Sequence, residues 1–178
     1  MDFGILIIVS VIVIVVLFFI LLFNYRGKFI VLDIKITEAE KELSTLLEMK
    51  RQMLISVCEK VDTIVEKDLF PDVDELKSEE LNSFVLSKLL ISMENRLLTE
   101  MNMRKAFVPD EELSGMFLSL DNISVDCESV EEYYNDNSEI FNRLLRRFPS
   151  NIVGKFNDYV IKEIYSHEEE EMFEILKD

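Results

Sequence analysis

Residues 3–23 have the sequence FGILIIVSVIVIVVLFFILLF, an apolar run without a charged side chain. As a helix with a rise of 1.5 Å per residue, the run is about 31 Å long, which matches the hydrocarbon thickness of a bilayer. A core helix of a soluble protein has a polar face, whereas this run is apolar on every side. The run therefore predicts a single transmembrane helix, and we place a transmembrane anchor at residues 1–25.

The flanks of the run predict that the anchor is retained, and they set its orientation. A cleaved signal peptide begins with basic residues and ends in a small-residue cleavage site, and neither feature surrounds this run. Asp2 precedes the run, and Arg26 and Lys28 follow it. Because basic residues stay on the cytoplasmic side, we expect a single-pass protein of the cell membrane. Its short N-terminus lies outside in this interpretation, and its body, residues 26–178, is cytoplasmic.

The composition of the body favours one helical domain. The whole chain has only four Gly and three Pro, which is typical of helices rather than strands and tight turns. Its net charge is −16, so we expect no nucleic-acid binding, which needs a basic surface, and no second electrostatic contact with anionic lipid. A basic protein partner remains open, beside the simpler interpretation of a surface kept soluble by its charge.

Two helices are expected between the anchor and Pro109. The first continues out of the anchor, because apolar residues recur at three- and four-residue steps. Its expected buried positions are Phe29, Leu32, Ile36, Ala39, Leu43, Leu46, Met53, Val57, Val61 and Ile64, and Lys50 lays its apolar stem along the same face. Pro71 is expected to end this helix, and Ser78-Glu79-Glu80-Leu81 to open a second one that fades around Lys105.

A third helix is expected after Pro109, with Asp110, Glu111 and Glu112 in its first turn. It shows a heptad pattern, which predicts a long helix packed at a small angle against its neighbours. The first heptad positions are Leu113, Leu120, Cys127, Tyr134, Phe141 and Phe148, and the fourth positions are Met116, Ile123, Val130, Asn137 and Leu144. Asn137 is either a functional group or a buried amide that fixes the register, and we favour the second interpretation.

The C-terminal segment is expected to contain two short helices. Pro149 ends the third helix, and Ser150 and Asn151 can cap a short helix through Lys155. Its expected apolar contacts are Val153, Phe156, Tyr159 and Ile164. Ser166 opens a last helix that ends near Leu176. The acidic residues after His167 belong to its first turn rather than to a metal site, because adjacent side chains point in different directions.

No residue pattern typical of catalysis or cofactor binding occurs in the sequence. There is no Gly-rich phosphate loop, and one His cannot supply the two Glu-x-x-His motifs of a di-iron bundle. Cys58 and Cys127 lie on or beside apolar stripes, so we expect buried free thiols. We therefore expect no enzymatic activity, no metal, no cofactor and no small-molecule substrate.

The most specific pattern lies near the C-terminus. It comprises Tyr134-Asn135, Phe141-Asn142 and Phe148-Pro149-Ser150-Asn151-Ile152-Val153, followed by Phe156, Tyr159 and Tyr165. This pattern resembles the YN…YN…FPxN motif of the LemA family of bacterial membrane proteins, and the similarity extends over nearly the whole chain. The chain departs from the family at Glu40 (usually Trp), Met49-Lys50 (an Arg pair), Ile55-Ser56 (Pro-Asn) and the acidic Glu131-Glu132.

The resemblance implies an all-α fold in which a single transmembrane helix is followed by an elongated antiparallel helical bundle, and it implies no defined activity. The residues themselves point to a structural role for the motif. We expect the amides of Asn135 and Asn142 to bind the backbone of the turn at Pro149–Asn151. The candidate site residues are Tyr134, Asn135, Phe141, Asn142, Pro149, Ser150 and Asn151.

Three functions of different classes are compatible with these features. The favoured one is a membrane-anchored scaffold or interaction module with an unidentified protein partner. The first alternative is a structural protein that assembles with itself in the membrane through the heptads of residues 113–148. The less favoured alternative is a membrane-tethered enzyme subunit that works through paired carboxylates.

Overall fold

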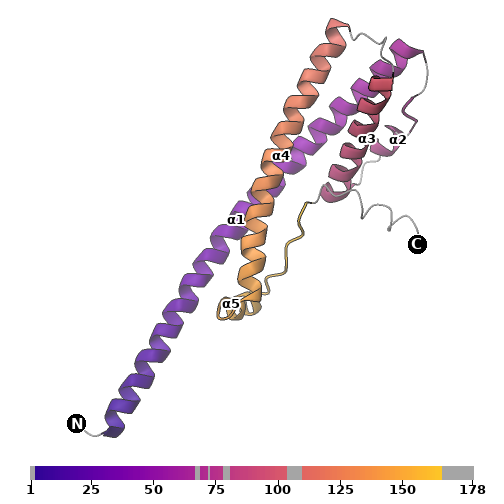
Figure 1. Cartoon of the computed structure of the whole chain (residues 1–178). Helices are drawn as coiled ribbons and strands as arrows, with labels where there is room; N and C mark the ends of the chain where they lie inside the picture. Colours follow the sequence, from indigo (N-terminus) through magenta and orange to yellow (C-terminus); the bar gives the residue numbers. More distant parts are fainter. Residues whose placement is uncertain (1–2, 67–68, 72, 78–80, 104–109, 166–178) are drawn as a thin grey trace, which may run out of the picture. The chain divides into compact units, whose positions relative to one another are not determined.

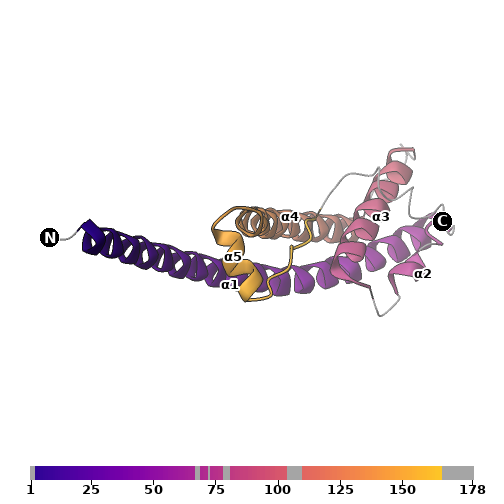
Figure 2. The ribbon, with the colours of Figure 1, turned by 90° about the horizontal axis from the view of Figure 1, so that it is seen from below.

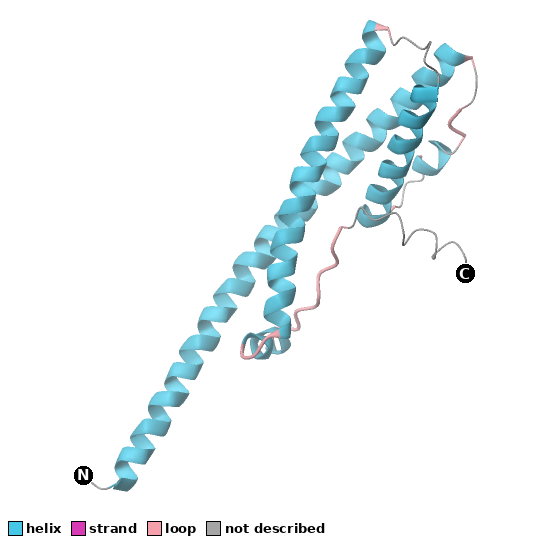
Figure 3. Cartoon of the chain, viewed as in Figure 1, coloured by secondary structure: helices cyan, strands magenta, loops and turns pink. Residues whose placement is uncertain are grey.

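The computed structural model describes residues 3–66, 69–71, 73–77, 81–103 and 110–165. Within these residues the chain is all-helical and contains no strand (Figure 3), which confirms the predicted all-α class. The helices in chain order are α1 (Phe3–Val65), α2 (Val73–Leu76), α3 (Ser83–Met103), α4 (Glu111–Arg146) and α5 (Ser150–Phe156) (Figure 1).

The chain divides into two compact units, each containing parts of α1 and α4. Unit 1 comprises Met1–Glu38 and Tyr133–Ile164, and unit 2 comprises Ala39–Glu132 and Tyr165–Asp178. This division follows the internal contacts of the chain. The boundary expected at residue 25 separates membrane from water instead, and it stays a prediction.

α1 is one uninterrupted helix of 63 residues that begins within the apolar run. It ends at Val65, where Glu66 adopts a left-handed backbone conformation with φ of 53°. The Asp62 side chain then accepts a 2.8 Å hydrogen bond from the backbone N–H of Leu69, which ties the following chain to the last turn. The prediction that Pro71 ends this helix is therefore wrong, because the backbone has left the helical path before it reaches Pro71.

The buried face of α1 differs from the predicted stripe by one position in two places. Leu47 and Leu54 are buried, whereas the predicted Leu46 and Met53 are partly exposed. Ile64, in the last turn, is exposed. A series of apolar residues stays on one face of a helix only when steps of three residues alternate regularly with steps of four. The other predicted positions, Phe29, Leu32, Ile36, Ala39, Leu43, Val57 and Val61, are buried, and so is Lys50.

α3 begins at Ser83 rather than at the predicted Ser78. Asn82 caps the helix, because its Oδ1 accepts a 2.8 Å hydrogen bond from the backbone N–H of Phe84. Leu81 precedes the cap, and residues 78–80 lie outside the described residues. The buried face is narrower than predicted, because the predicted positions Val85 and Leu98 are exposed. It consists of Leu86, Ser87, Leu90, Met93 and Leu97.

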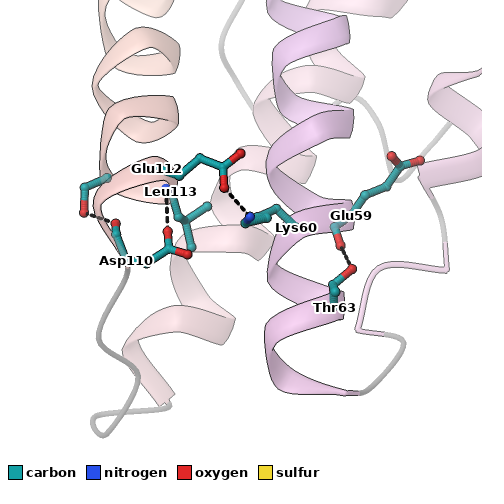
Figure 4. A network of polar contacts seen from close by, with 7 residues as sticks. Glu59, Lys60, Thr63, Asp110, Glu112 and Leu113 are labelled. Atoms are coloured by element: carbon teal, nitrogen blue, oxygen red, sulfur yellow. Dashed lines mark hydrogen bonds and ion pairs between the residues drawn. The ribbon is translucent and has the colours of Figure 1, made fainter.

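α4 has the predicted acidic first turn, but Asp110 precedes the helix as its cap instead of lying in that turn. Asp110 Oδ1 accepts a 2.7 Å hydrogen bond from the backbone N–H of Leu113 (Figure 4). Glu111 and Glu112 follow in the first turn, where the helix dipole favours negative charge. Glu112 also pairs with Lys60 of α1 (Figure 4). Glu112 is largely exposed, so this pair contributes little stability.

The predicted burial of the residues at the first heptad position is confirmed for all of them except Phe148. Five of these side chains are at most 3% exposed: Leu113, Leu120, Cys127, Tyr134 and Phe141. Phe148, the sixth, lies beyond the end of α4 and is 74% exposed. Asn137 is buried as predicted, but its Nδ2 donates a 2.7 Å hydrogen bond to the backbone oxygen of Tyr133 in its own helix. That bond stays within α4, so it does not set a register between helices.

Within unit 2, α3 and α4 run antiparallel. Ser87 contacts Glu131, and seven residues further along α3, Glu94 contacts Ser124, which lies seven residues earlier in α4. A shift by the same number of residues in opposite directions is the signature of antiparallel helices packed at a small angle.

α1 and α4 are also antiparallel within unit 2. Lys60 of α1 pairs with Glu112, whereas Lys50, earlier in α1, acts electrostatically on Cys127, later in α4. Because α4 opposes both helices, α1 and α3 run in the same direction. Residues 66–82, which include α2, connect them.

Both cysteines are buried free thiols, as predicted. Burial raises the pKa of the Cys58 thiol to about 12, and the nearby Asp62 carboxylate raises it further. Burial likewise raises the pKa of Cys127 to about 11, against the lowering effect of Lys50. Nucleophilic thiol chemistry needs the thiolate, so neither side chain is poised for it near neutral pH.

We predict that native protein resists thiol labelling. At pH 8, pKa values of about 12 and 11 leave about one thiolate in 10⁴ for Cys58 and one in 10³ for Cys127, against about one in ten for the ordinary value of 9.0. Iodoacetamide labelling followed by mass spectrometry should be at least about a hundredfold slower in native than in urea-unfolded protein. Equal rates would contradict the burial of both thiols.

The same shifts have a defined sign for stability. The pKa of each thiol is higher in the folded state than in the unfolded chain. The contribution of the neutral thiols to the free energy of unfolding is therefore fully present below pH 9. That contribution falls as the pH rises from 9 toward the folded values, because the unfolded chain then releases protons that the folded chain retains.

Candidate functional site

The candidate site residues predicted from the sequence all belong to unit 1. They occupy the last turns of α4, the turn that follows and α5, and the chain then runs through residues 157–164, which we call the return segment. Figure 2 shows α5 beside α1. Gly154 of α5 is buried there, and a Cβ atom at this position would contact Leu145 of α4 and lie 3.9 Å from Phe29 of α1. A residue without a side chain therefore lets the helices approach.

Three aromatic rings form the core of unit 1. Phe29 of α1 lies 5.2 Å from Phe141 of α4 and 5.2 Å from Tyr159 of the return segment, and the last two are 5.4 Å apart, measured between ring centroids. Such spacings and the edge-to-face angle of 84° between Phe29 and Phe141 are favourable for aromatic pairs. Phe141 and Tyr134 are thus core residues, as predicted.

Asn142 binds the return segment rather than the turn. Its Nδ2 donates to the backbone oxygen of Lys162, and its Oδ1 accepts from the backbone N–H of Lys162, both at 2.8 Å. The prediction that this amide binds the backbone at Pro149–Asn151 is therefore wrong. An amide side chain can donate to the backbone oxygen and accept from the backbone N–H of the same residue when that residue lies outside a helix. The helical turn does not offer such a pair of free backbone groups.

Ser150 holds the turn itself. Its Oγ lies 2.7 Å from the backbone oxygen of Leu144 and 2.8 Å from that of Arg147, both at the end of α4. The backbone N–H of Asn151 donates to the Arg147 oxygen at 2.7 Å. Pro149 stands at the N-cap of α5 and makes no side-chain hydrogen bond there. The prediction that Ser150 caps α5 is wrong, because its single O–H is shared between the carbonyl oxygens of Leu144, in the last turn of α4, and Arg147, just after it.

A basic cleft of about 670 Å³ lies beside this site, lined by Glu139, Asn142, Arg143, Arg146, Arg147, Ile161, Lys162 and Ile164. Lys162 Nζ pairs with Asp33 of α1 at 3.1 Å. The guanidinium groups of Arg143, Arg146 and Arg147 make no ion pair with other described residues. This cleft can attract anionic groups, and it was missed from composition because net charge averages over the chain.

The charges are in fact divided between the units. Unit 1 contains eight basic and seven acidic residues, a net charge of +1, whereas unit 2 contains eleven basic and 28 acidic residues, a net charge of −17. Residues 143–157 hold four basic side chains and no acidic one. That local run was the sequence signal that could have revealed the cleft.

Unit 2 contains buried polar pairs that were not predicted from the sequence. Lys50 of α1, whose side chain is 7% exposed, pairs with Glu94 of α3 at 2.8 Å. Ser124 of α4 donates a 2.7 Å hydrogen bond to the same carboxylate. Ser87 Oγ donates at 2.7 Å to Glu131, which is buried on α4. The Lys50–Glu94 pair compensates both of its charges inside unit 2, as buried ionic groups require, and Ser87 supplies Glu131 with a hydrogen bond.

Neither the residues around the turn after α4 nor the buried polar pairs of unit 2 form a catalytic set that we recognise. Among the residues that the structure describes, no group of three or more His, Cys, Asp or Glu side chains is placed to hold a metal ion. His167 and the acidic residues after it lie outside the described residues. The geometry of unit 1 instead offers contact surfaces, one basic and one apolar.

We predict that Asn142→Ala destabilises unit 1 locally. The substitution leaves the backbone N–H and oxygen of Lys162 without their partner, at a cost of about 1–3 kcal/mol in the free energy of unfolding. Hydrogen exchange in residues 157–164 of the full-length protein in detergent should accelerate. The control is Asn122→Ala, an exposed position of the same helix, which should leave exchange there unchanged. Equal protection in both variants would contradict the assigned role of Asn142.

We predict that the Lys50–Glu94 pair is costly to break singly. Glu94→Gln leaves the Lys50 ammonium uncompensated and should lower the free energy of unfolding by about 2–4 kcal/mol, because Lys50 is nearly buried. Replacing both, Lys50→Met with Glu94→Gln, should recover most of that loss in chemical unfolding. The control is Glu48→Gln in the less buried pair with Arg51, whose side chains are 40% and 17% exposed, and this change should cost at most about 1 kcal/mol. A double variant less stable than Glu94→Gln alone would show that the unpaired ammonium is not the source of the loss.

Comparisons with known proteins give no match: no protein-family model, no curated protein and no solved structure is similar to this chain.

Proposed function

We propose that this chain is a single-pass membrane protein whose helical body acts as a scaffold or interaction module. One observation carries the proposal. Among the residues that the structure describes, one helix is long and apolar enough to cross a membrane, with a mean hydropathy of 3.8 over its most apolar 18 residues, none of them buried within the chain. Contiguous apolar surface of that extent needs a lipid environment or a partner to cover it.

The proposed orientation places the body in the cytoplasm. Arg26 and Lys28 follow the apolar run directly, within the short stretch of sequence whose charge bears on orientation. Basic residues close to a span favour the cytoplasmic side.

The proposal includes membership of the LemA family and an elongated helical bundle as its body. What supports it is the placement of the motif residues, since Tyr134 and Phe141 are buried and Asn142 and Ser150 make the bonds that order the chain after α4. In the proposed role, these contacts of the motif residues hold the body in a fixed shape that a partner protein recognises. A non-enzymatic role is therefore part of the proposal.

Self-assembly through the heptads is less favoured. Leu113, Leu120 and Cys127 are already buried within the single chain. A second copy could not pack on these positions unless unit 2 opened. The strongly acidic surface of unit 2 also disfavours contact between like copies, and it favours a partner with basic residues.

We predict that the full-length protein, crosslinked in its native membrane and purified, retains a stoichiometric protein partner. The control is the segment of residues 1–28 fused to an unrelated soluble domain, which should not retain it. Replacing the exposed acidic residues Glu40 and Glu42 of unit 2 with glutamine should reduce recovery of a basic partner, because attraction between unlike charges is lost.

Other outcomes of this experiment separate the proposals. Crosslinked ladders that contain only this chain would favour a self-assembling structural protein. A monomer without any partner would contradict the scaffold proposal. Loss of the protein from the membrane fraction in alkaline carbonate would contradict the anchor.

A further inference from the structure

An apolar surface remains exposed around α5. Four large side chains near the turn after α4 are between 58% and 84% exposed, although residues between them are buried in the core of unit 1. They are Phe148, Phe156, Val160 and Ile161. Single exposed apolar residues are common, but four within 14 residues form a surface that calls for an apolar environment.

Contacts within unit 1 place this surface along the membrane-proximal part of α1. Phe148 stacks on Phe18, with ring centroids 6.4 Å apart. Phe18 lies within the apolar run, five residues before its end at Phe23, which is about 8 Å along the helix axis. Phe148 therefore reaches the level of side chains that the proposed span places in hydrocarbon.

The other end of the surface is fixed by Phe29. Tyr159 lies against Phe29 at 5.2 Å, and Phe29 follows the end of the apolar run by six residues, or about 9 Å. The chain from Phe148 to Tyr159, which contains α5, thus lies along the part of α1 that brackets the boundary between hydrocarbon and headgroups. Both views show α5 beside α1 (Figures 1 and 2).

The charges around this surface suit a layer of anionic headgroups. Residues 3–32 and 143–161 contain six basic residues and one acidic residue, Asp158. Arg143, Arg146 and Arg147 line the basic cleft. Apolar rings flanked by Arg and Lys are typical of segments that lie in the membrane interface, and the cytoplasmic leaflet is the one rich in anionic lipid.

We propose that the α4–α5 corner, residues 143–161, is a second membrane contact that lies in the interface of the bilayer spanned by residues 3–23. Phe148 and Phe156 insert at the boundary of the acyl chains, and Arg143, Arg146, Arg147 and Lys155 bind the phosphates of anionic phospholipids. The inference rests on the proposed function, because it takes the apolar run to be a transmembrane span. It reverses, for unit 1, the expectation that the net charge argues against contact with anionic lipid.

The absence of Trp from the chain makes this inference directly testable. A single Trp is introduced by Phe156→Trp in the full-length protein, which is reconstituted into vesicles of phosphatidylcholine and phosphatidylglycerol. One set of vesicles contains lipids brominated near the top of the acyl chains, and a second set contains lipids brominated near the chain ends. Val13→Trp, within the apolar run, reports on the span. Leu118→Trp, an exposed position of α4 in unit 2, is the matched control.

We expect the shallow bromines to quench the Trp in Phe156→Trp to at least about half the extent to which the deep bromines quench Val13→Trp, because an interfacial side chain lies close to the shallow bromines. Neither set of bromines should quench Leu118→Trp. Quenching of Val13→Trp without quenching of Phe156→Trp would overturn this inference and leave the anchor intact. No quenching of Val13→Trp would overturn the anchor and the inference together. Equal quenching of Leu118→Trp would show nonspecific adsorption of the whole body and would also overturn the inference.

The role of the arginines is tested in the Phe156→Trp background. Replacing Arg143, Arg146 and Arg147 with glutamine should lower the quenching in anionic vesicles to the level seen in pure phosphatidylcholine, because the attraction to phosphate is lost. The control is Lys41→Gln, an exposed basic position of unit 2, which should change nothing. Quenching that does not depend on the phosphatidylglycerol content would overturn the headgroup contact.

Discussion

The proposed membrane span brings the constraint on which the rest of the structure depends, namely that every backbone polar group inside a bilayer must be satisfied. Without water to bond, a spanning segment must be helical. Starting a helix is costly, whereas extending it by one residue is cheap. A helix required by the apolar run therefore continues into the body, where α1 supplies the face on which α4 and α5 pack in unit 1 and α3 and α4 pack in unit 2.

Burial of polar groups then makes this packing specific. Apolar faces alone tolerate sliding by a turn, whereas Lys50 with Glu94 and Ser87 with Glu131 meet in only one register of unit 2. In unit 1, Asn142 fixes the packing in the same way, because its amide forms hydrogen bonds with both backbone groups of Lys162. Mismatching any of these pairs would leave a buried polar group unsatisfied, which costs more than the pair itself gains.

The parts of the fold that depend on local chemistry could be predicted from the sequence. The long first helix, the cap at Asp110 and the buried heptad positions up to Phe141 follow from periodicity and capping residues. The end of α1 at Val65 could not be predicted, because Glu66 has no intrinsic preference for a left-handed conformation. Nor could the partner of Asn142 or the exposure of Phe148, because both are decided by where the chain goes after α4. The basic cleft was hidden by a net charge dominated by unit 2.

The two buried thiols affect how the protein responds to oxidation. Oxidants attack the thiolate, and each step from sulfenic to sulfonic acid adds polar oxygen to the sulfur. Cys58 and Cys127 are protected from this chemistry while unit 2 stays folded, because both lie in its core with raised pKa values. Once oxidised in a transiently opened chain, either side chain would be too large and too polar to return to its site. Oxidation to sulfinic or sulfonic acid during brief local opening would therefore make the loss of the native state permanent.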